Sequence, residues 1–362
     1  MVYRSSDTLT DRHRRIDSIQ ALRGIAFLFI FLGHCSVIPS GFAAFGVSIF
    51  IILSGFLLTI KNGRRIDTNV RSNVKFAWRK IKRLFPLHVI CTLLMMLICT
   101  DFSSVLSVVQ NIVKSALNIF LVQSWIPKID ISMSLNGVAW YLSTCVFLFF
   151  LYPYISRFIR KYKIIIEPIL YSALAITLMI IIRIATLQFG DDFSTWATYC
   201  FPLYRLLDFF VGCNIGWLVR NYKEIMTLQK RSYFTYLEFL SICACFIVSY
   251  LQSKTYASYM LKTVFTSAII DLPISCLLVV MFYLHNGDVT SKLENKILVE
   301  IGNLSPYLFL IHYTVIAYCR AVLSKITSIN ISVLLVPISF CISIMLAHLY
   351  RNLIEDKRNV SN

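Results

Sequence analysis

Long apolar runs separated by short polar segments dominate the hydropathy pattern of this chain. Runs of about 17 to 25 mostly apolar residues have the length that crosses a bilayer as an α-helix. The predicted membrane-spanning helices are 19–38, 42–60, 84–100, 137–156, 164–183, 199–219, 234–252, 263–285, 304–323 and 331–350. The pattern therefore predicts an all-α fold, a polytopic membrane helix bundle with about ten transmembrane helices.

A further apolar stretch at 105–122 would reverse the orientation of every later helix if it also crossed the membrane. The distribution of positive charge decides against this. With a cytoplasmic N-terminus and ten spans, 26 of the 35 Lys and Arg residues fall in cytoplasmic segments, as the positive-inside rule requires. We therefore expect both termini in the cytoplasm, and we expect 101–136 to form an outer loop with a surface or re-entrant helix.

The expected organisation is a basic N-terminal segment (1–18), one membrane domain (19–350) with a basic cytoplasmic loop (61–83), and a short cytoplasmic tail (351–362). Of the 362 residues, 57% are hydrophobic and only 15% are charged, which is outside the range of soluble domains. A cleaved signal peptide is an alternative reading of the first span, but the next span follows almost at once. Any chemistry must be done inside this membrane domain or at its surfaces.

The charge and the cysteine content limit the kinds of partner and bound metal that the chain is expected to have. The net charge of +17 comes from short basic loops beside the spans rather than from one basic domain, so membrane lipids are expected partners and nucleic acid is not. The 11 cysteines lie mainly within spans, with Cys243 and Cys245 as the one close pair. We predict neither a disulfide framework nor a metal site.

Two ionisable residues, Arg23 and His34, lie in the first predicted span. They are 11 positions apart, which is three helical turns plus about 20° and roughly 16 Å, so both point to one face. Alone, Arg23 suits a side chain that snorkels to the inner headgroups, and His34 suits a bond to a neighbouring helix. Together they favour function, with the imidazole as a general base and the guanidinium as a cation for phosphate or carboxylate.

A basic cluster precedes the third span. Arg79, Lys80, Lys82 and Arg83 fall within five positions, and Arg79 and Arg83, or Lys80 and Arg83, share one face of a helix. Such a cluster can clamp a polyphosphate ligand, or it can bind anionic lipid headgroups and fix the topology.

Further polar residues lie in later spans. Arg205 and Asp208 are three positions apart, which is typical of a structural ion pair. Asp271 and His312 are the two candidate partners of His34. Each of these four residues is a candidate for orienting His34 or for binding an acceptor substrate.

Trp140 and Tyr141 begin the fourth span at its outer end. Aromatic residues at that position form an interfacial belt, or they offer a flat platform on which a sugar ring stacks. The belt is the commoner arrangement, and both readings stay open.

Seven motifs occur along nearly the whole chain in a fixed order. They are IQALRGIAFLFIFLGH, FGVSIFIILSGFLL, RKIKRLFP, GVAWYLSTCVFLFFLYP, PLYRLLDFFVGCNIG, IGNLSPYLFLIHYTV and YRNLIEDK. In this order they resemble the acyltransferase 3 family of integral membrane acyltransferases, particularly the single-domain members that O-acetylate cell-surface polysaccharides.

The resemblance implies an O-acyltransferase, an enzyme that transfers an acyl group, most often acetyl, from cytoplasmic acyl-CoA to a hydroxyl group. His34 matches the histidine thought essential in the family, and Arg23 matches its paired arginine. Two positions depart from the family pattern. The Arg-x-x-Arg motif appears as Lys80 to Arg83, and Cys145 occupies a position that is often glutamate.

These observations lead to one mechanistic hypothesis. Acetyl-CoA or another acyl-CoA, the donor substrate rather than a resident cofactor, binds with its phosphates on Arg79, Lys80 and Arg83, and its pantetheine arm passes Arg23. His34 then acts as general base on a hydroxyl of a carbohydrate or glycolipid acceptor at the cell membrane. The competing hypothesis is a secondary transporter that uses the intramembrane Arg, His and Asp residues. A homodimer stays open under either hypothesis.

Overall fold

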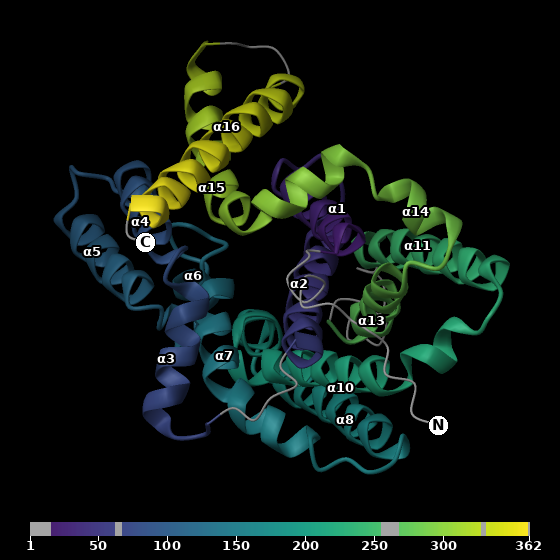
Figure 1. The fold of residues 1–362 in the computed structure, drawn as a ribbon. Helices are drawn as coiled ribbons and strands as arrows, with labels where there is room; N and C mark the ends of the chain where they lie inside the picture. The colour runs from purple at the N-terminus through teal and green to yellow at the C-terminus, as the bar shows by residue number, and fades with distance from the viewer. Residues whose placement is uncertain (1–15, 62–66, 255–267, 327–330, 361–362) are drawn as a thin grey trace.

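A computed structural model describes residues 16–61, 67–254, 268–326 and 331–360, and every regular element in these ranges is a helix (Figure 1). In chain order the elements are α1 (Asp17–His34), α2 (Ser40–Lys61), α3 (Val70–Ile81), α4 (Phe85–Cys99), α5 (Val105–Ile119), η2 (Gln123–Trp125), α6 (Ile129–Ser132), α7 (Trp140–Ile159), α8 (Ile166–Leu187), α9 (Asp191–Thr195), η3 (Trp196–Cys200), α10 (Pro202–Thr227), α11 (Arg231–Lys254), α13 (Ala268–Leu284), α14 (Asp288–Leu293), α15 (Lys296–Ile326) and α16 (Ile331–Val360).

The chain is a polytopic helical membrane protein. Each of the ten predicted spans falls on one of these helices. Six helices, namely α2, α7, α8, α11, α15 and α16, are long and apolar enough to cross a membrane, and a seventh span results if α3 and α4 count as one helix bent by 64°. The remaining predicted spans fall on α1, α10 and α13. The first two carry ionisable residues that lower their mean hydropathy, and α13 has 17 described residues.

Some predicted segments extend beyond the described residues. Residues 1–15 of the N-terminal segment, 62–66 of the basic loop, 263–267 of the eighth span and 361–362 of the tail all lie outside them.

The segment predicted as an outer loop folds back along α4. The ring Nε2 of His88, in the first turn of α4, donates to the backbone oxygen of Asn118 in the last turn of α5, at 2.8 Å. Helix α5 therefore runs the full length of α4 in the opposite direction. The chain after α5 forms only the short helices η2 and α6, and several of its polar side chains are buried, as with Ser124, whose hydroxyl bonds that of Ser143 at 2.6 Å. Irregular backbone needs such a protein cover wherever it lies at membrane depth, and an outer loop 101–136 with a surface or re-entrant helix stays a prediction.

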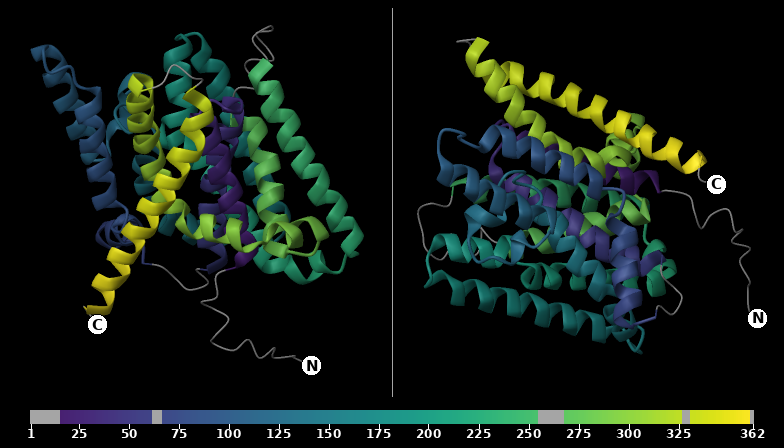
Figure 2. Two further views of the ribbon diagram at one scale, coloured as in Figure 1. Left: turned by 90° about the horizontal axis from the view of Figure 1, so that it is seen from above. Right: turned by 90° about the vertical axis from the view of Figure 1, so that its left-hand side faces the viewer.

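Helix α1 lies at the centre of the bundle, between α2 and α15 (Figures 1 and 2). Two glycines let α1 and α15 approach closely. A Cβ added at Gly24 would lie 2.4 Å from the carbonyl oxygen of Leu298, and one at Gly302 would lie 1.8 Å from that of Gln20. Small residues at such crossings are the usual means by which membrane helices pack backbone against backbone.

A second close crossing joins α2 to α10. Cβ atoms added at Gly55 and Gly212 would each lie 2.3 Å from a carbonyl oxygen of the opposite helix, that of Phe209 or of Ile52. The helices α1, α2, α10 and α15 therefore form one tightly packed frame. This frame sets the positions of the side chains that the helices carry.

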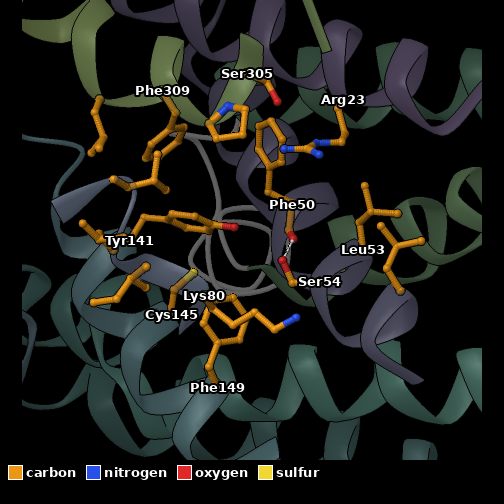
Figure 3. Close-up of a pocket in the computed structure, with 16 residues that line it drawn as sticks. Arg23, Phe50, Leu53, Ser54, Lys80, Tyr141, Cys145, Phe149, Ser305 and Phe309 are labelled. Carbon is orange, nitrogen blue, oxygen red and sulfur yellow. Dashed lines mark hydrogen bonds between the residues drawn. The ribbon is translucent and has the colours of Figure 1, made fainter. Parts of the chain in front are cut away.

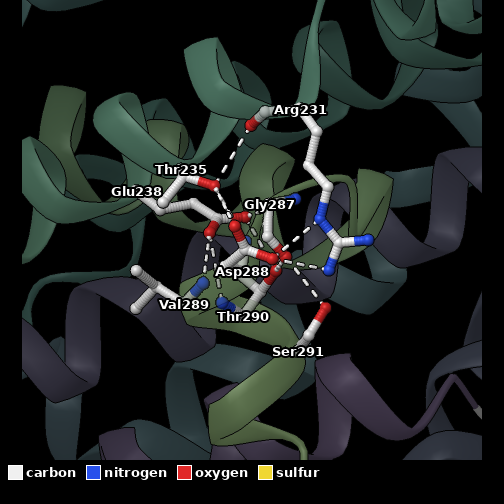
Figure 4. Close-up of polar contacts among 8 residues, drawn as sticks. All are labelled: Arg231, Thr235, Glu238, Gly287, Asp288, Val289, Thr290 and Ser291. Atoms are coloured by element: carbon white, nitrogen blue, oxygen red, sulfur yellow. Dashed lines mark hydrogen bonds and ion pairs between the residues drawn. The ribbon is translucent and has the colours of Figure 1, made fainter.

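A buried carboxylate fixes the short helix before α15. Glu238 of α11 is 1% exposed and accepts hydrogen bonds from the backbone N–H groups of Gly287, Val289 and Thr290, at 3.0 to 3.1 Å, and from the Thr290 hydroxyl at 2.7 Å (Figure 4). Carboxylates are favourable at helix N-termini because backbone N–H groups there lack partners. Glu238 thereby ties the connection between α13 and α15 to α11.

An exposed ion pair lies beside this cap. Arg231 binds Asp288 at 2.6 Å, and its guanidinium holds the pKa of that carboxyl below its usual range (Figure 4). Exposed pairs contribute little to stability. The buried cap therefore contributes more than the ion pair to holding α14 in place.

The close approach of α1 and α15 gives a direct test. We expect Gly302→Ala to lower the free energy of unfolding by about 1 to 3 kcal/mol, because the added methyl group must push the Gln20 carbonyl away. Thermal unfolding of the purified protein in detergent measures the loss. Ala116→Ser, one added atom at an exposed site on α5, is the control. Equal stability of Gly302→Ala and wild type would contradict the packing described here.

Candidate functional site

Arg23 and His34 both lie on the continuous helix α1, so the separation of roughly 16 Å expected from helical rise holds. The two residues meet different surroundings. Arg23 lines a cavity, whereas His34, the last residue of the helix, contacts α15. The face of α1 that carries Arg23 and His34 therefore borders two distinct sites.

His34 forms a pair with His312 of α15. The Nδ1 atom of His34 lies 2.9 Å from Nε2 of His312, and the two rings stack with centroids 5.1 Å apart. The other ring nitrogen of His312, Nδ1, lies 2.9 Å from the carbonyl oxygen of Leu308. The three groups form one chain of hydrogen bonds.

This chain of hydrogen bonds selects one tautomer of each neutral ring. The Leu308 carbonyl can only accept, so Nδ1 of His312 carries the proton and its Nε2 is an acceptor. His34 must then donate from Nδ1, which leaves Nε2 of His34 with a free lone pair. A lone pair on a positioned imidazole nitrogen is what a general base requires.

Aromatic groups surround the pair. His312 is fully buried, and the Phe27 ring meets it edge-on with centroids 5.5 Å apart. The Tyr313 ring meets half-buried His34 at 82°, with centroids 5.3 Å apart. Arg320 donates to the backbone oxygen of His34 at 3.4 Å. These contacts hold both imidazoles in place, and His34 is the more accessible of the two.

A cavity of about 240 Å³ lies between α1, α2, α7, α15 and the end of α3. Its walls are mostly apolar, and its polar groups include Arg23, Lys80, Tyr141 and Ser54 (Figure 3). Figure 3 shows the Tyr141 hydroxyl and the Lys80 ammonium pointing towards the cavity, with the Arg23 guanidinium at its edge. Two cations beside an apolar chamber suit a ligand with an anionic end and an apolar end.

The cavity ends close to the histidine pair. Phe309 forms part of its wall, and the Phe309 ring centroid lies 4.8 Å from that of Tyr141 and 6.1 Å from that of His312. One aromatic ring therefore separates the cavity from His312. A ligand that enters beside Lys80 and Arg23 extends towards the pair.

The basic cluster contributes unequally to this cavity. Lys80 lines it, with Nζ 5.2 Å from the Phe76 ring centroid. Arg79 in the last turn of α3, and Lys82 and Arg83 in the turn before α4, are exposed and do not line it. Lys80 is therefore the member of the predicted cation group that reaches the ligand space.

The other predicted polar residues take separate positions. Arg205 and Asp208 form a buried ion pair within α10, 2.7 Å apart. Asp271 accepts a hydrogen bond from Gln252 at 2.7 Å. Of the two candidate partners, the one that contacts His34 is therefore His312. In the described parts of the chain, no three His, Cys, Asp or Glu side chains gather into a metal site.

The aromatic pair at the start of α7 is divided. Trp140 is 3% exposed and packs on Tyr199 with ring centroids 4.8 Å apart. The belt reading is therefore wrong for Trp140, because its side chain packs inside the protein instead of facing lipid. Tyr141 lines the cavity beside Cys145.

Sequence reasoning missed Phe309 and Tyr313. Phe309 lies three positions before His312, so helical spacing was enough to predict it as a neighbour of that histidine, whereas Tyr313 follows His312 directly and its contact with His34 could not be predicted this way. Their roles depend on the contacts with Tyr141 and His34, which no local pattern reveals.

Sequence similarity to known proteins extends over most of the chain. The family model described as an acyltransferase domain matches residues 16–348, which include both histidines and the basic turn. A protein named acyltransferase MdmB, from Streptomyces mycarofaciens, is 26% identical over 337 residues, covering 84% of this chain and 80% of that protein. No solved structure matches the chain.

The hydrogen-bond chain predicts a measurable tautomer. In ¹⁵N spectra of histidine-labelled protein, we expect the Nδ1 of His34 to be protonated and its Nε2 to be bare. We expect His312→Phe to abolish this preference, because the acceptor for Nδ1–H is removed. His88→Phe, at a histidine bound to a different helix, is the control and must leave the His34 signals unchanged. A proton on Nε2 of His34 in the wild type would reverse the assignment.

Proposed function

This chain belongs to the acyltransferase 3 family of membrane acyltransferases, and on that premise we propose that it moves an acyl group, most often acetyl, from cytoplasmic acyl-CoA to a hydroxyl group of a lipid-linked or cell-surface glycan. Membership of an enzyme family favours this function over a transporter. The observation that carries the proposal is the hydrogen-bonded pair of His34 and His312, in which His312 is separated from the cation-lined cavity by the Phe309 ring.

The cavity supports a role as the donor site. Acyl-CoA combines phosphate groups with a long, weakly polar arm that ends in a thioester. Lys80 and Arg23 offer cations for phosphate oxygens, and the apolar walls suit the arm. Arg79 and Arg83, exposed at the same turn, extend the positive surface outwards and remain part of the proposed phosphate site.

The histidine pair supports direct transfer. Nε2 of His34 takes the proton from the acceptor hydroxyl while the hydroxyl oxygen attacks the thioester carbonyl carbon. The C–S bond then breaks, the new C–O bond remains, and the CoA sulfur leaves and recovers the proton. His312 is a positioning residue in this scheme, because it fixes the tautomer of His34 rather than touching the acceptor.

The topology follows from the same proposal. Ten spans with both termini in the cytoplasm put the basic turn of Lys80 on the cytoplasmic side, where acyl-CoA is available. His34 then lies towards the outer side, at the far end of α1. In the cell membrane this arrangement lets a cytoplasmic donor meet an outward-facing acceptor without moving CoA across the bilayer.

Removal of the proposed base tests the reaction. Purified protein in lipid, given radiolabelled acetyl-CoA and a membrane glycolipid extract, is expected to label the glycolipid. We expect His34→Ala to reduce the rate by about 10² to 10⁴, the usual contribution of a general base. His88→Ala serves as the control for the loss of a buried histidine. Failure of the wild type to transfer label to any acceptor would reject the proposal.

Charge reversal tests the donor site. We expect Lys80→Glu to weaken acetyl-CoA binding by at least about tenfold, because a phosphate contact inside the cavity is replaced by repulsion. Lys75→Glu is the matched control, an exposed lysine on the same helix that does not line the cavity. Calorimetric titration measures both. Equal affinities of the two variants would place the phosphates elsewhere.

A further inference from the structure

Helix α3 lies beside α7 at the edge of the bundle, and it is inclined by 64° to α4, the helix that follows it (Figure 1). Its inner face packs on the bundle, where the Phe76 ring stacks on Tyr152 of α7 with centroids 5.7 Å apart. Because α4 occupies the third predicted span, an inclination of this size turns α3 towards the membrane plane. Amphipathic helices at a membrane surface have this orientation.

Two exposed stripes run along the outer side of α3. The apolar stripe repeats every fourth residue, with exposed fractions of 63%, 54% and 48% for Val70, Val74 and Trp78. The cationic stripe is made of the residue that follows each of these, namely Arg71, Lys75 and Arg79, which are also exposed. The cationic stripe therefore lies about 100° further round the helix than the apolar stripe. Adjacent stripes of these two kinds let one helix contact lipid chains and lipid headgroups together.

The cationic stripe has no acidic partner among the residues that the structure describes. None of the ion pairs found there involves Arg71, Lys75 or Arg79. The carboxylate nearest in sequence, that of Asp67, accepts a hydrogen bond from the Ser72 hydroxyl at 2.9 Å, at the start of the helix. The positive charge of the stripe is therefore available to an anionic ligand.

The apolar stripe borders a groove of about 340 Å³ between α3, α7 and the chain that follows α5. Val74 and Trp78 form part of its α3 side. Its other walls are mostly apolar or aromatic and include Phe120, Trp125, Val146 and Phe147. Ser143 also lines the groove, but its hydroxyl donates to the backbone oxygen of Leu121 at 2.6 Å and is therefore engaged. Such a lining suits a hydrocarbon chain.

The groove and the cationic stripe adjoin each other on one helix. Lys75 directly follows Val74, and Arg79 directly follows Trp78. Each of these cations is therefore one helical position away from a side chain that lines the groove. A phospholipid has the same two parts side by side, since its apolar chains are joined to a phosphate group. The basic loop 61–83 that contains the stripe is predicted to be cytoplasmic, and the cytoplasmic leaflet is the one with a negative surface potential.

We propose that the groove, together with Arg71 and Lys75, binds an anionic phospholipid of the cytoplasmic leaflet. One acyl chain lies in the groove, Trp78 lies at the level of the headgroup, and the two cations contact the phosphate and the negatively charged headgroup. A zwitterionic phospholipid fills the same groove but gains less from the cations, so the site prefers the anionic lipid. The site is separate from the proposed donor cavity, which Lys80 lines and which Arg71 and Lys75 do not line.

Photo-crosslinking measures this preference without requiring activity. Full-length protein in phosphatidylcholine nanodiscs receives a trace of phosphatidylglycerol or of phosphatidylcholine, each with the same diazirine in one acyl chain. We expect the phosphatidylglycerol probe to label peptides from α3, α7 and 120–125 about tenfold more strongly, because each cation near a lipid surface adds roughly fivefold in binding. We expect the double variant Arg71→Gln with Lys75→Gln to reduce this preference to less than about threefold. Equal labelling of these peptides by the two probes in the wild type would overturn the proposal.

A second double variant separates this site from a general effect of charge. Arg220→Gln with Lys230→Gln removes two exposed cations at the end of α10 and before α11, in another segment predicted to be cytoplasmic. We expect it to keep the full preference for phosphatidylglycerol. The same loss of preference in both double variants would show that any surface cation acts in this way, and would overturn the proposal.

Filling the groove tests where the acyl chain lies. We expect Val146→Trp to reduce labelling by the phosphatidylglycerol probe about tenfold, because the indole occupies the space of the chain. Leu170→Trp, at an exposed position of α8, is the matched control and keeps full labelling of the same peptides. Thermal unfolding of both variants establishes that they are folded. Wild-type labelling in folded Val146→Trp would place the chain outside the groove and reject the assigned site.

Discussion

The close crossing of α1 and α15 is the constraint on which the site depends. The two helices meet where Gly24 and Gly302 allow backbone to touch backbone. His34 lies ten residues beyond Gly24, and His312 lies ten residues beyond Gly302, so equal helical rise of about 15 Å brings both histidines to one level. A larger residue at either glycine would separate the helices, and a 2.9 Å contact between two short side chains cannot stretch to follow. The geometry of the proposed base is thus set a long way from the histidines themselves.

Local periodicity was enough to predict the parts of the site that lie on single helices. The ten apolar runs all fall on helices, and the shared face of Arg23 and His34 follows from their spacing of 11 positions on one helix. The prediction stopped where contacts join distant segments. Asp271 and His312 were equal candidates as partners of His34, because nothing local distinguishes a residue 278 positions away.

The surroundings of a side chain in the folded protein explain the residues whose positions could not be predicted from local sequence. Trp140 has the residue type and position of a belt residue, but it is 3% exposed and packs on Tyr199. The four cations before the third span look alike in sequence, and the bend of 64° after α3 leaves Lys80 as the one that lines the cavity. The segment after α5 has serines with no partner that is evident from the sequence, and in the folded chain Ser124 bonds the Ser143 hydroxyl of α7 and Ser132 donates to the backbone oxygen of Ile126. In each case the environment depends on contacts that form only on folding.

Three neighbouring side chains of α15 face three different surroundings. Phe309, Ile311 and His312 are almost consecutive, and successive positions of a helix differ by about 100°. One of them therefore faces the cation-lined cavity, one faces an apolar groove between α4, α15 and α16, and one faces His34. His312 lines neither space, so the helix whose side chains line both of them also holds the residue that sets the tautomer of His34.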